Sequence, residues 1–97
     1  MSILVLVELE ARDGKADEMV EVLGRTLVDT RARQGCESVN VHRDHANPNS
    51  VLLVERWATL EDDAAYRAWR AGDGAVAEMA DLVGGRPSIR YFADVDA

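Results

Sequence analysis

The sequence contains little of what builds disulfide frameworks, metal cages or membrane spans. Of its 97 residues, one is cysteine, two are histidine and two are proline. Cys36 alone can form neither an intramolecular disulfide nor a cysteine-based metal cage. The longest apolar run, Ile3 to Val7, is far shorter than the run of about 20 residues that a membrane-spanning helix needs. No basic leader followed by an apolar stretch opens the chain, so we expect a cytoplasmic protein without a secretory signal.

Basic residues are also few, with 11 against 18 acidic residues and a net charge of −7. This balance disfavours binding to phosphate backbones and anionic membranes. The arginines are scattered from Arg12 to Arg90 and form no patch. We therefore expect neither nucleic acid nor membrane as a partner. The hydrophobic content of 47% and the charged content of 30% are typical of a globular domain, and we expect one domain over residues 1–97.

Hydrophobic periodicity predicts the secondary structure. Alternation with a period of two, rich in β-branched residues, predicts four strands, at Ser2–Glu10, Cys36–Arg43, Val51–Trp57 and Ser88–Val95. An apolar stripe at three- and four-residue steps predicts an amphipathic helix after Lys15. A second helix is predicted from Thr59, interrupted at Gly72 and followed by a short helical piece over residues 75–83.

Three residues are candidates for helix ends. Asp13 is predicted to cap the first helix, and Gly35 to end it as a left-handed residue. Thr59 is predicted to cap the second helix, with Asp62 as a weak partner in a capping box. The order β-α-β-β-α-β predicts an α+β fold, a ferredoxin-like sandwich with an antiparallel sheet. Right-handed crossovers place the first and third strands at its centre.

The two central strands are apolar on both faces, although the helices can cover only one. Leu4 and Leu6 lie opposite Ile3, Val5 and Val7, and Leu52 and Val54 repeat the pattern on the third strand. An uncovered apolar patch of this kind is unusual on a monomer. We expect a homodimer whose subunits pack sheet to sheet. The alternative is that these residues reflect only β-propensity.

Several short motifs fall at the ends of the predicted elements. They are Gly14-Lys15, Gly35-Cys36, Val41-His42-Arg43-Asp44, Val54-Glu55-Arg56-Trp57, Ala65-Tyr66 and Pro87-Ser88-Ile89. With these motifs the chain resembles the antibiotic biosynthesis monooxygenase family, nearly end to end from Val5 to Tyr91. Glu-Arg-Trp at the end of a central strand is the most specific of them.

The resemblance implies a dimeric α+β barrel with a small cavity between sheet and helices in each subunit. Enzymes of the family oxidise phenols, quinols and polyketide aromatics with molecular oxygen. They use no flavin, haem or metal, because the deprotonated substrate supplies the electron. The implied partners are a second copy of the chain, a small aromatic molecule and molecular oxygen, without a cofactor.

The resemblance also marks aromatic site residues. Trp57 matches a cavity tryptophan, and Tyr66 matches a tyrosine that hydrogen-bonds the substrate. Trp69 lies three residues after Tyr66 and is expected to complete an aromatic wall that binds the substrate. Trp57 could equally be a core aromatic, and Tyr66 an ordinary buried tyrosine.

Glu55 shares the strand face of Trp57, since alternate residues on a strand point the same way. If that face lines the cavity, burial should raise the pKa of this carboxyl and suit it as a general base. The more common outcome is a structural ion pair with a neighbouring arginine, such as Arg56 or Arg90, across the sheet or the dimer.

Asn40, His42 and Leu53 complete the candidate substrate contacts. Asn40 could donate to an oxyanion, and His42 titrates near neutral pH, but the hairpin register decides which face they share. Because Val39 and Val41 compete for the inward positions, the outer face is favoured for both. Leu53 stands where monooxygenases of the family often carry asparagine, and nothing polar replaces it.

Two functions therefore follow from the sequence. One is a cofactor-independent monooxygenase acting on a small phenol, quinol or polyketide-type aromatic. The other is a non-catalytic barrel that binds a small aromatic or hydrophobic ligand, which Leu53 favours.

Overall fold

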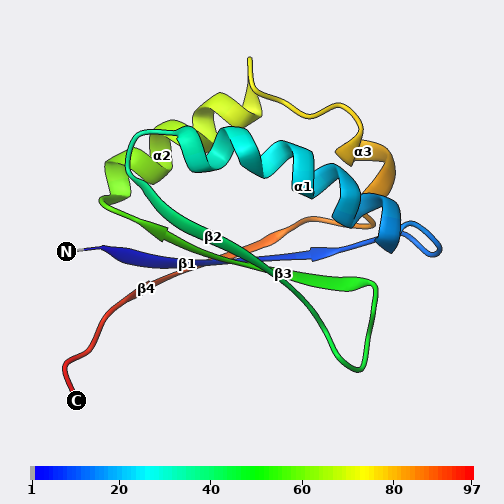
Figure 1. Ribbon diagram of the computed structural model, residues 1–97, viewed down its shortest axis with the longest axis horizontal. Coiled ribbons are helices and arrows are strands. Elements are labelled where there is room, and N and C mark those ends of the chain that lie inside the picture. Colours follow the sequence, from blue (N-terminus) through cyan, green and yellow to red (C-terminus); the bar gives the residue numbers. More distant parts are fainter. Residues whose placement is uncertain (1) are drawn as a thin grey trace.

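The computed structural model describes residues 2–97 and shows an antiparallel sheet with its helices on one face (Figure 1). The elements in chain order are β1 (Ile3–Glu10), α1 (Ala16–Ala32), β2 (Cys36–Arg43), β3 (Ser50–Trp57), α2 (Leu60–Ala71), α3 (Met79–Leu82) and β4 (Ser88–Ala93). The strand order β2-β3-β1-β4 confirms the ferredoxin-like fold and the central position of the first and third strands. The last strand is two residues shorter than predicted, and the short helical piece is a single turn. Among residues 2–97, no helix is long and apolar enough to cross a membrane.

Alternate side chains of the two central strands, β1 and β3, point to opposite faces of the sheet. On the helix side, Val5, Val7, Val51, Leu53 and Trp57 are at most 5% exposed. Their neighbours on the other face, such as Leu6 and Val54, are half-buried although no helix of residues 2–97 covers them. The register pairs Leu6 with Val54 and Leu4 with Arg56 across that face. An apolar strip along the open face of the sheet is therefore a feature of the single chain.

Of the two predicted N-caps, Thr59 is confirmed and Asp13 is not. Thr59 is the N-cap of α2, and its hydroxyl accepts a hydrogen bond from the Asp62 amide at 3.0 Å, as predicted. The prediction for Asp13 is wrong, because α1 begins only at Ala16 and Lys15 holds its N-cap position. The Arg12–Lys15 backbone turn separates Asp13 from the first free amides of the helix, and its carboxylate accepts instead from Asn49 at 3.4 Å.

Gly35 has the predicted left-handed backbone, with φ +85°, but it lies beyond the helix end. Arg33 is the C-cap of α1, and Gly35 instead brings the loop against α2. Its carbonyl accepts from the Ala58 amide at 2.7 Å, and a Cβ at this position would overlap the side chain of Asp62. Both the backbone angle and the close approach require glycine here.

Gly35→Ala should therefore lower the free energy of unfolding by about 1–2 kcal/mol, the usual cost of a left-handed non-glycine residue, and by more if Asp62 cannot move. Gly24→Ala is the matched control, because Gly24 lies inside α1 with open space around its Cβ position. It should raise the same quantity by about 0.5–1 kcal/mol. Urea unfolding of both variants checks the prediction, and equal effects at the two glycines would contradict it.

Candidate functional site

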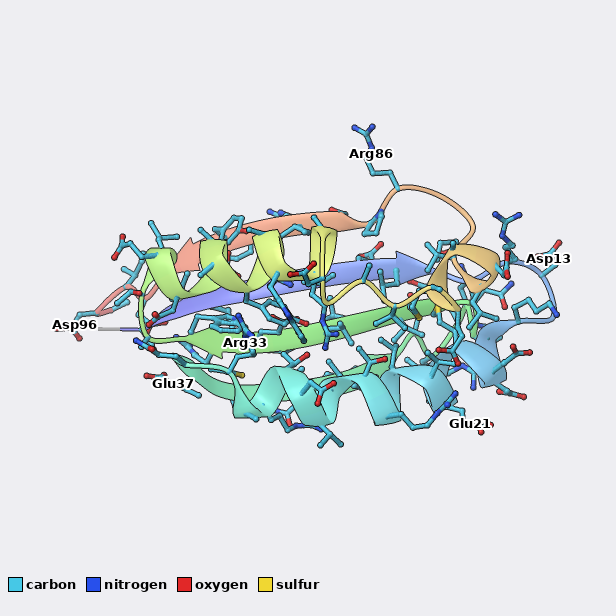
Figure 2. All side chains as sticks on the ribbon, turned by 90° about the horizontal axis from the view of Figure 1, so that it is seen from above. Asp13, Glu21, Arg33, Glu37, Arg86 and Asp96 are labelled. Carbon is cyan, nitrogen blue, oxygen red and sulfur yellow. The ribbon has the colours of Figure 1, made fainter. Side chains whose placement is uncertain are left out.

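A cavity of about 380 Å³ lies between the helices and the sheet. Seen from above, α1 and α2 lie side by side over the sheet (Figure 2). The cavity volume is in the range of small-molecule sites. Most of its wall is apolar, formed by Leu9, Leu23, Leu27, Leu53, Ala75, Val76, Met79 and Pro87. Its polar lining consists of Thr26, Glu55, Tyr66, Arg67 and Arg70.

Trp57 lies beside this cavity and is not among the residues that line it. Its side chain is fully buried, and its ring centroid is 5.0 Å from that of Tyr66. Its indole Nε1 donates to Glu55 Oε1 at 2.8 Å. Trp57 and Tyr66 thus lie on the same side of the sheet, and Trp57 supports the residues of the cavity wall.

Glu55 reaches the cavity and is held in an ion pair. Its side chain is 1% exposed, and Oε1 accepts from Arg67 at 2.8 Å as well as from Trp57. The prediction that Arg56 or Arg90 pairs with Glu55 is wrong. Arg56 follows Glu55 on the strand and so points to the open face, where it binds Asp94 at 2.9 Å, and Arg90 faces the same side.

Arg67 joins Glu55 to a second buried carboxylate. It also binds Asp63 at 2.9 Å, and Asp63 is 2% exposed. Burial opposes the charge of Arg67, but the Glu55 and Asp63 carboxylates outweigh this and raise the pKa of the guanidinium. Tyr91 donates to Asp63 Oδ2 at 2.9 Å, and burial together with this bond raises the pKa of Tyr91.

Tyr66 is one of the polar groups at the side of the cavity nearest α1. Its hydroxyl lies 2.7 Å from Thr30 Oγ1, and it accepts from Arg70 Nε at 2.9 Å. Arg70 also donates to Thr30 Oγ1 at 3.0 Å, to the Thr26 carbonyl at 2.9 Å and to the Gly74 carbonyl at 3.0 Å. Arg70 forms no ion pair with any of residues 2–97. This end of the cavity therefore holds a cation whose bonds all go to neutral oxygens.

Trp69 lies outside the cavity, so the substrate contact predicted for it is not seen. Its ring packs against Gly74, and the guanidinium groups of Arg33 and Arg70 are 4.3 and 4.5 Å from its centroid. At 3.6 residues per turn, Trp69 is about 60° from Tyr66 to one side of α2, whereas Arg70 is about 40° to the other. The cavity is on the side of Arg70.

Asn40 and His42 do not join the cavity either. The register pairs Asn40 with Val54 and His42 with Leu52, so both residues belong to the open face of the sheet. Val39 and Val41, which pair with Glu55 and Leu53, take the inward positions. The outer-face interpretation is thus correct, and a contact of Asn40 or His42 with a ligand in the cavity is ruled out by the pleat.

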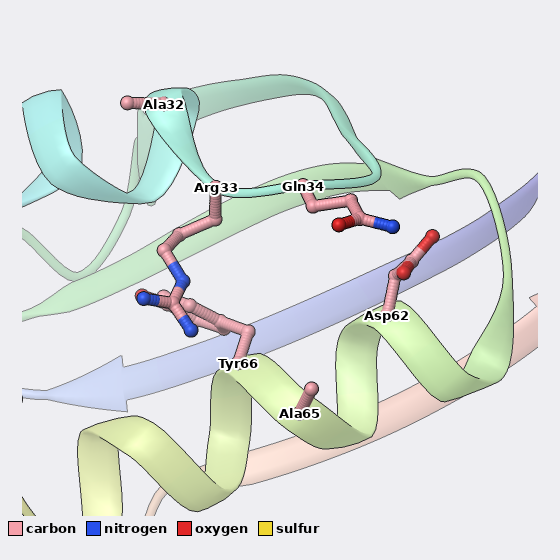
Figure 3. Close-up of a pocket in the computed structure, with 6 residues that line it drawn as sticks. All are labelled: Ala32, Arg33, Gln34, Asp62, Ala65 and Tyr66. Atoms are coloured by element: carbon pink, nitrogen blue, oxygen red, sulfur yellow. The ribbon is translucent and has the colours of Figure 1, made fainter.

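A second cleft, of about 520 Å³, lies between the end of α1 and α2 (Figure 3). Arg33 and Gln34 approach it from the loop after α1, and Asp62 and Ala65 from α2 (Figure 3). Tyr66 lines both this cleft and the cavity of about 380 Å³. The ring of Tyr66 is therefore a wall common to the two.

Three residues of the site, Thr30, Arg67 and Arg70, are not predicted from the sequence. A signal was available, because Arg67 lies four residues after Asp63 and Arg70 four residues after Tyr66, the spacing at which helical side chains meet. Burial, followed by the nearby Glu55 carboxylate, raises the pKa of the Cys36 thiol.

The comparisons with known proteins agree with this architecture. The family model of the antibiotic biosynthesis monooxygenases matches residues 2–80. The chain is similar in structure to a candidate antibiotic biosynthesis monooxygenase from Deinococcus radiodurans, with a TM-score of 0.81 and 22% identity over 98% of this chain and 94% of that one.

Two further structures show the same likeness. A candidate antibiotic biosynthesis monooxygenase from Bordetella bronchiseptica has a TM-score of 0.79 and 17% identity over 97% of both chains. A protein from Mycobacterium tuberculosis has a TM-score of 0.76 and 18% identity over 100% of this chain and 98% of its own. No curated protein matches the chain. At these identities the structures establish the fold.

Proposed function

The chain belongs to the antibiotic biosynthesis monooxygenase family, and from this premise we propose that it oxidises a small phenol, quinol or polyketide-type aromatic with molecular oxygen. The observation that carries the proposal is the cavity of about 380 Å³ beneath α1 and α2. Its apolar wall suits an aromatic ring, and Tyr66 supplies a hydroxyl at its polar end.

The proposed reaction takes its electrons from the ionised ring and needs no flavin, haem or metal. One atom of molecular oxygen forms a new carbon–oxygen bond, and the other leaves as water with the two hydrogens that the phenol loses in becoming a quinone. Tyr66 holds the oxygen of the substrate by a hydrogen bond, and the apolar wall packs against the reacting ring.

Glu55 and Trp57 have supporting roles in this proposal. The Glu55 carboxylate already accepts from Trp57 and Arg67 at 2.8 Å each, so it is not a free base. Its bonds fix Arg67 at the cavity wall. Trp57 fixes the rotamer of Glu55 and packs beneath Tyr66.

The alternative is a binding protein without catalysis, and Leu53 is the observation that favours it. Leu53 lines the cavity and leaves its β3 wall without a hydrogen-bond donor from this position. An oxygen electrode distinguishes the two functions, with metal-free protein tested against hydroquinones and anthrones. Oxygen uptake above that of heat-denatured protein supports the monooxygenase. Saturable binding without uptake over the whole series favours the binding protein.

We also propose that residues 1–97 form one domain that pairs with a second copy through the open face of the sheet. The resemblance implies a dimer, and the strip around Leu6 and Val54 is the apolar surface that needs a cover. Leu6→Asp or Val54→Asp should convert the dimer into monomers in light scattering, since an unpaired charge in an interface costs several kcal/mol.

Val28→Asp is the control for these two variants. Val28 is 63% exposed on α1, away from the open face, so this variant should remain dimeric. A wild-type chain that scatters as a monomer at micromolar concentration would contradict the proposed pairing.

A further inference from the structure

We propose that Glu55, besides holding Arg67, binds the ligand directly by accepting a hydrogen bond from a neutral hydroxyl group on the aromatic ring. This inference rests on the proposed function, because it narrows the substrate class of the same cavity. A substrate that ionises at one hydroxyl then needs a second hydroxyl that keeps its proton. The class is a dihydroxylated aromatic ring rather than a ring with a single hydroxyl.

The first support is a difference between the two carboxylate oxygens of Glu55. Oε1 accepts from the Trp57 indole and from Arg67, at 2.8 Å each, whereas Oε2 accepts from no group of residues 2–97. Within the same residues, every side-chain oxygen or nitrogen that is shut off from solvent has a partner. Oε2 is therefore the atom through which Glu55 reaches the cavity, although the side chain as a whole is 1% exposed.

The second support is the charge at this wall of the cavity. Glu55 and Asp63 share the guanidinium of Arg67, at 2.8 and 2.9 Å, so the three residues together carry one excess negative charge. An ionised oxygen of the ligand is repelled at Oε2. A hydroxyl that donates its proton there forms a hydrogen bond to a charged acceptor, which is stronger than a bond between neutral groups.

The third support is that Glu55 and the Tyr66 hydroxyl are separate polar positions. The hydroxyl is bound to Thr30 and Arg70, and no hydrogen bond joins it to Glu55 in the part of the chain that the structure describes. Leu53, two residues before Glu55 on β3, adds apolar surface on the same face of the strand. A ring that packs on Leu53 can place one hydroxyl at Oε2 and direct its other substituents elsewhere.

Glu55→Gln inverts the group that faces the cavity and so gives the sharpest variant. Two N–H groups already point at the position of Oε1, from Trp57 and Arg67. The amide oxygen of glutamine must take that position, because an amide nitrogen there would meet two donors. The amide NH₂ group then replaces Oε2, so the wall presents a donor in place of an acceptor while the size of the side chain is kept.

The test compares hydroquinone with 4-methoxyphenol, in which a methyl group replaces one hydroxyl proton. Binding is measured by titration calorimetry under nitrogen, so that oxidation does not consume the probes. The wild-type protein should bind hydroquinone roughly tenfold more tightly, since the methoxy group leaves Oε2 without a donor. In Glu55→Gln this preference should disappear or reverse, because the methoxy oxygen can accept from the new amide group.

Asp63→Asn is the matched control. It changes the other carboxylate at Arg67, but both oxygens of Asp63 already have partners, in Arg67 and Tyr91, and Asp63 does not line the cavity. This variant should keep the preference of the wild type. The same preference in Glu55→Gln, or an equal loss of it in Asp63→Asn, would overturn the proposal.

A measurement on the wild type keeps the test decisive if Glu55→Gln does not fold. In protein labelled with ¹³C at the glutamate carboxyl groups, the Glu55 resonance should shift on addition of hydroquinone and much less with 4-methoxyphenol. Equal affinities for the two probes, no binding of either, or equal shifts would reject the contact with Glu55.

Oxygen uptake is measured separately with the same two compounds. A wild-type protein that prefers hydroquinone but consumes no oxygen with any substrate retains the Glu55 contact and rejects the monooxygenase. A protein that oxidises both compounds and binds them with equal affinity retains the monooxygenase and rejects the Glu55 contact.

Discussion

Replacing Arg67 with methionine should lower the free energy of unfolding by about 3–5 kcal/mol, the cost of breaking a buried ion pair from one side. Glu55 and Asp63 are 1% and 2% exposed, and both depend on this guanidinium. Methionine preserves much of the length of the side chain, so the loss measures mainly the two uncompensated carboxylates. Urea unfolding monitored by tryptophan fluorescence gives the difference.

Arg25→Met is the matched control. Arg25 pairs with Glu78 at 3.4 Å, but their side chains are 64% and 60% exposed. A pair of this kind contributes at most about 1 kcal/mol. Adding Glu55→Gln to Arg67→Met should recover part of the loss, because it removes one of the buried charges. Similar losses for the two arginine variants would show that the Glu55–Arg67–Asp63 cluster is not a buried ionic unit.

Tyr66→Phe should lower kcat for the proposed oxidation by roughly 100-fold, the usual effect of removing one donor to a developing charge. KM should change much less, because the ring of Tyr66 and the apolar wall remain. The variant keeps the aromatic contact with Trp57 and removes only the hydroxyl that Thr30 and Arg70 hold. Steady-state oxygen uptake against substrate concentration separates the two parameters.

Tyr91→Phe removes the hydroxyl of the other tyrosine, which binds Asp63 and does not line the cavity. This variant should retain kcat within a few-fold. Equal kcat for wild type and Tyr66→Phe would exclude the Tyr66 hydroxyl from the reaction, even where the cavity still binds the substrate.

Much of the fold follows from local patterns that tertiary structure does not override. The alternation in β1 and β3 predicts that Val5 and Leu53 face the helices. It also predicts that Leu6 and Val54 face the open side of the sheet. The prediction that Thr59 caps α2 is correct, because its hydroxyl accepts from an amide within the first turn of the same helix. The prediction that Asp13 caps α1 is wrong, because the first residue of a helix depends on the preceding turn. Composition alone does not determine that turn.

The residues of the candidate site are harder to predict from the sequence, because the site depends on which side of a helix faces the cavity. Strand parity correctly brings Leu53 and Glu55 to the cavity wall. On α2, the spacing alone did not distinguish Trp69, on one flank of Tyr66, from Arg70 on the other. The partner of Glu55 lies 12 residues away on a different element, and no local pattern selects Arg67 among the arginines.

If the chain is a monooxygenase, molecular oxygen is the source of the oxygen atom inserted into the substrate, and isotope labelling measures this. Metal-free protein is incubated with a hydroquinone or an anthrone under ¹⁸O₂, and the product is analysed by mass spectrometry. We expect each product molecule to carry one atom of ¹⁸O, with the second recovered in water, and Tyr66→Phe to slow its formation. Product whose new oxygen comes from water, or no turnover of any of these aromatics, would contradict the proposed function.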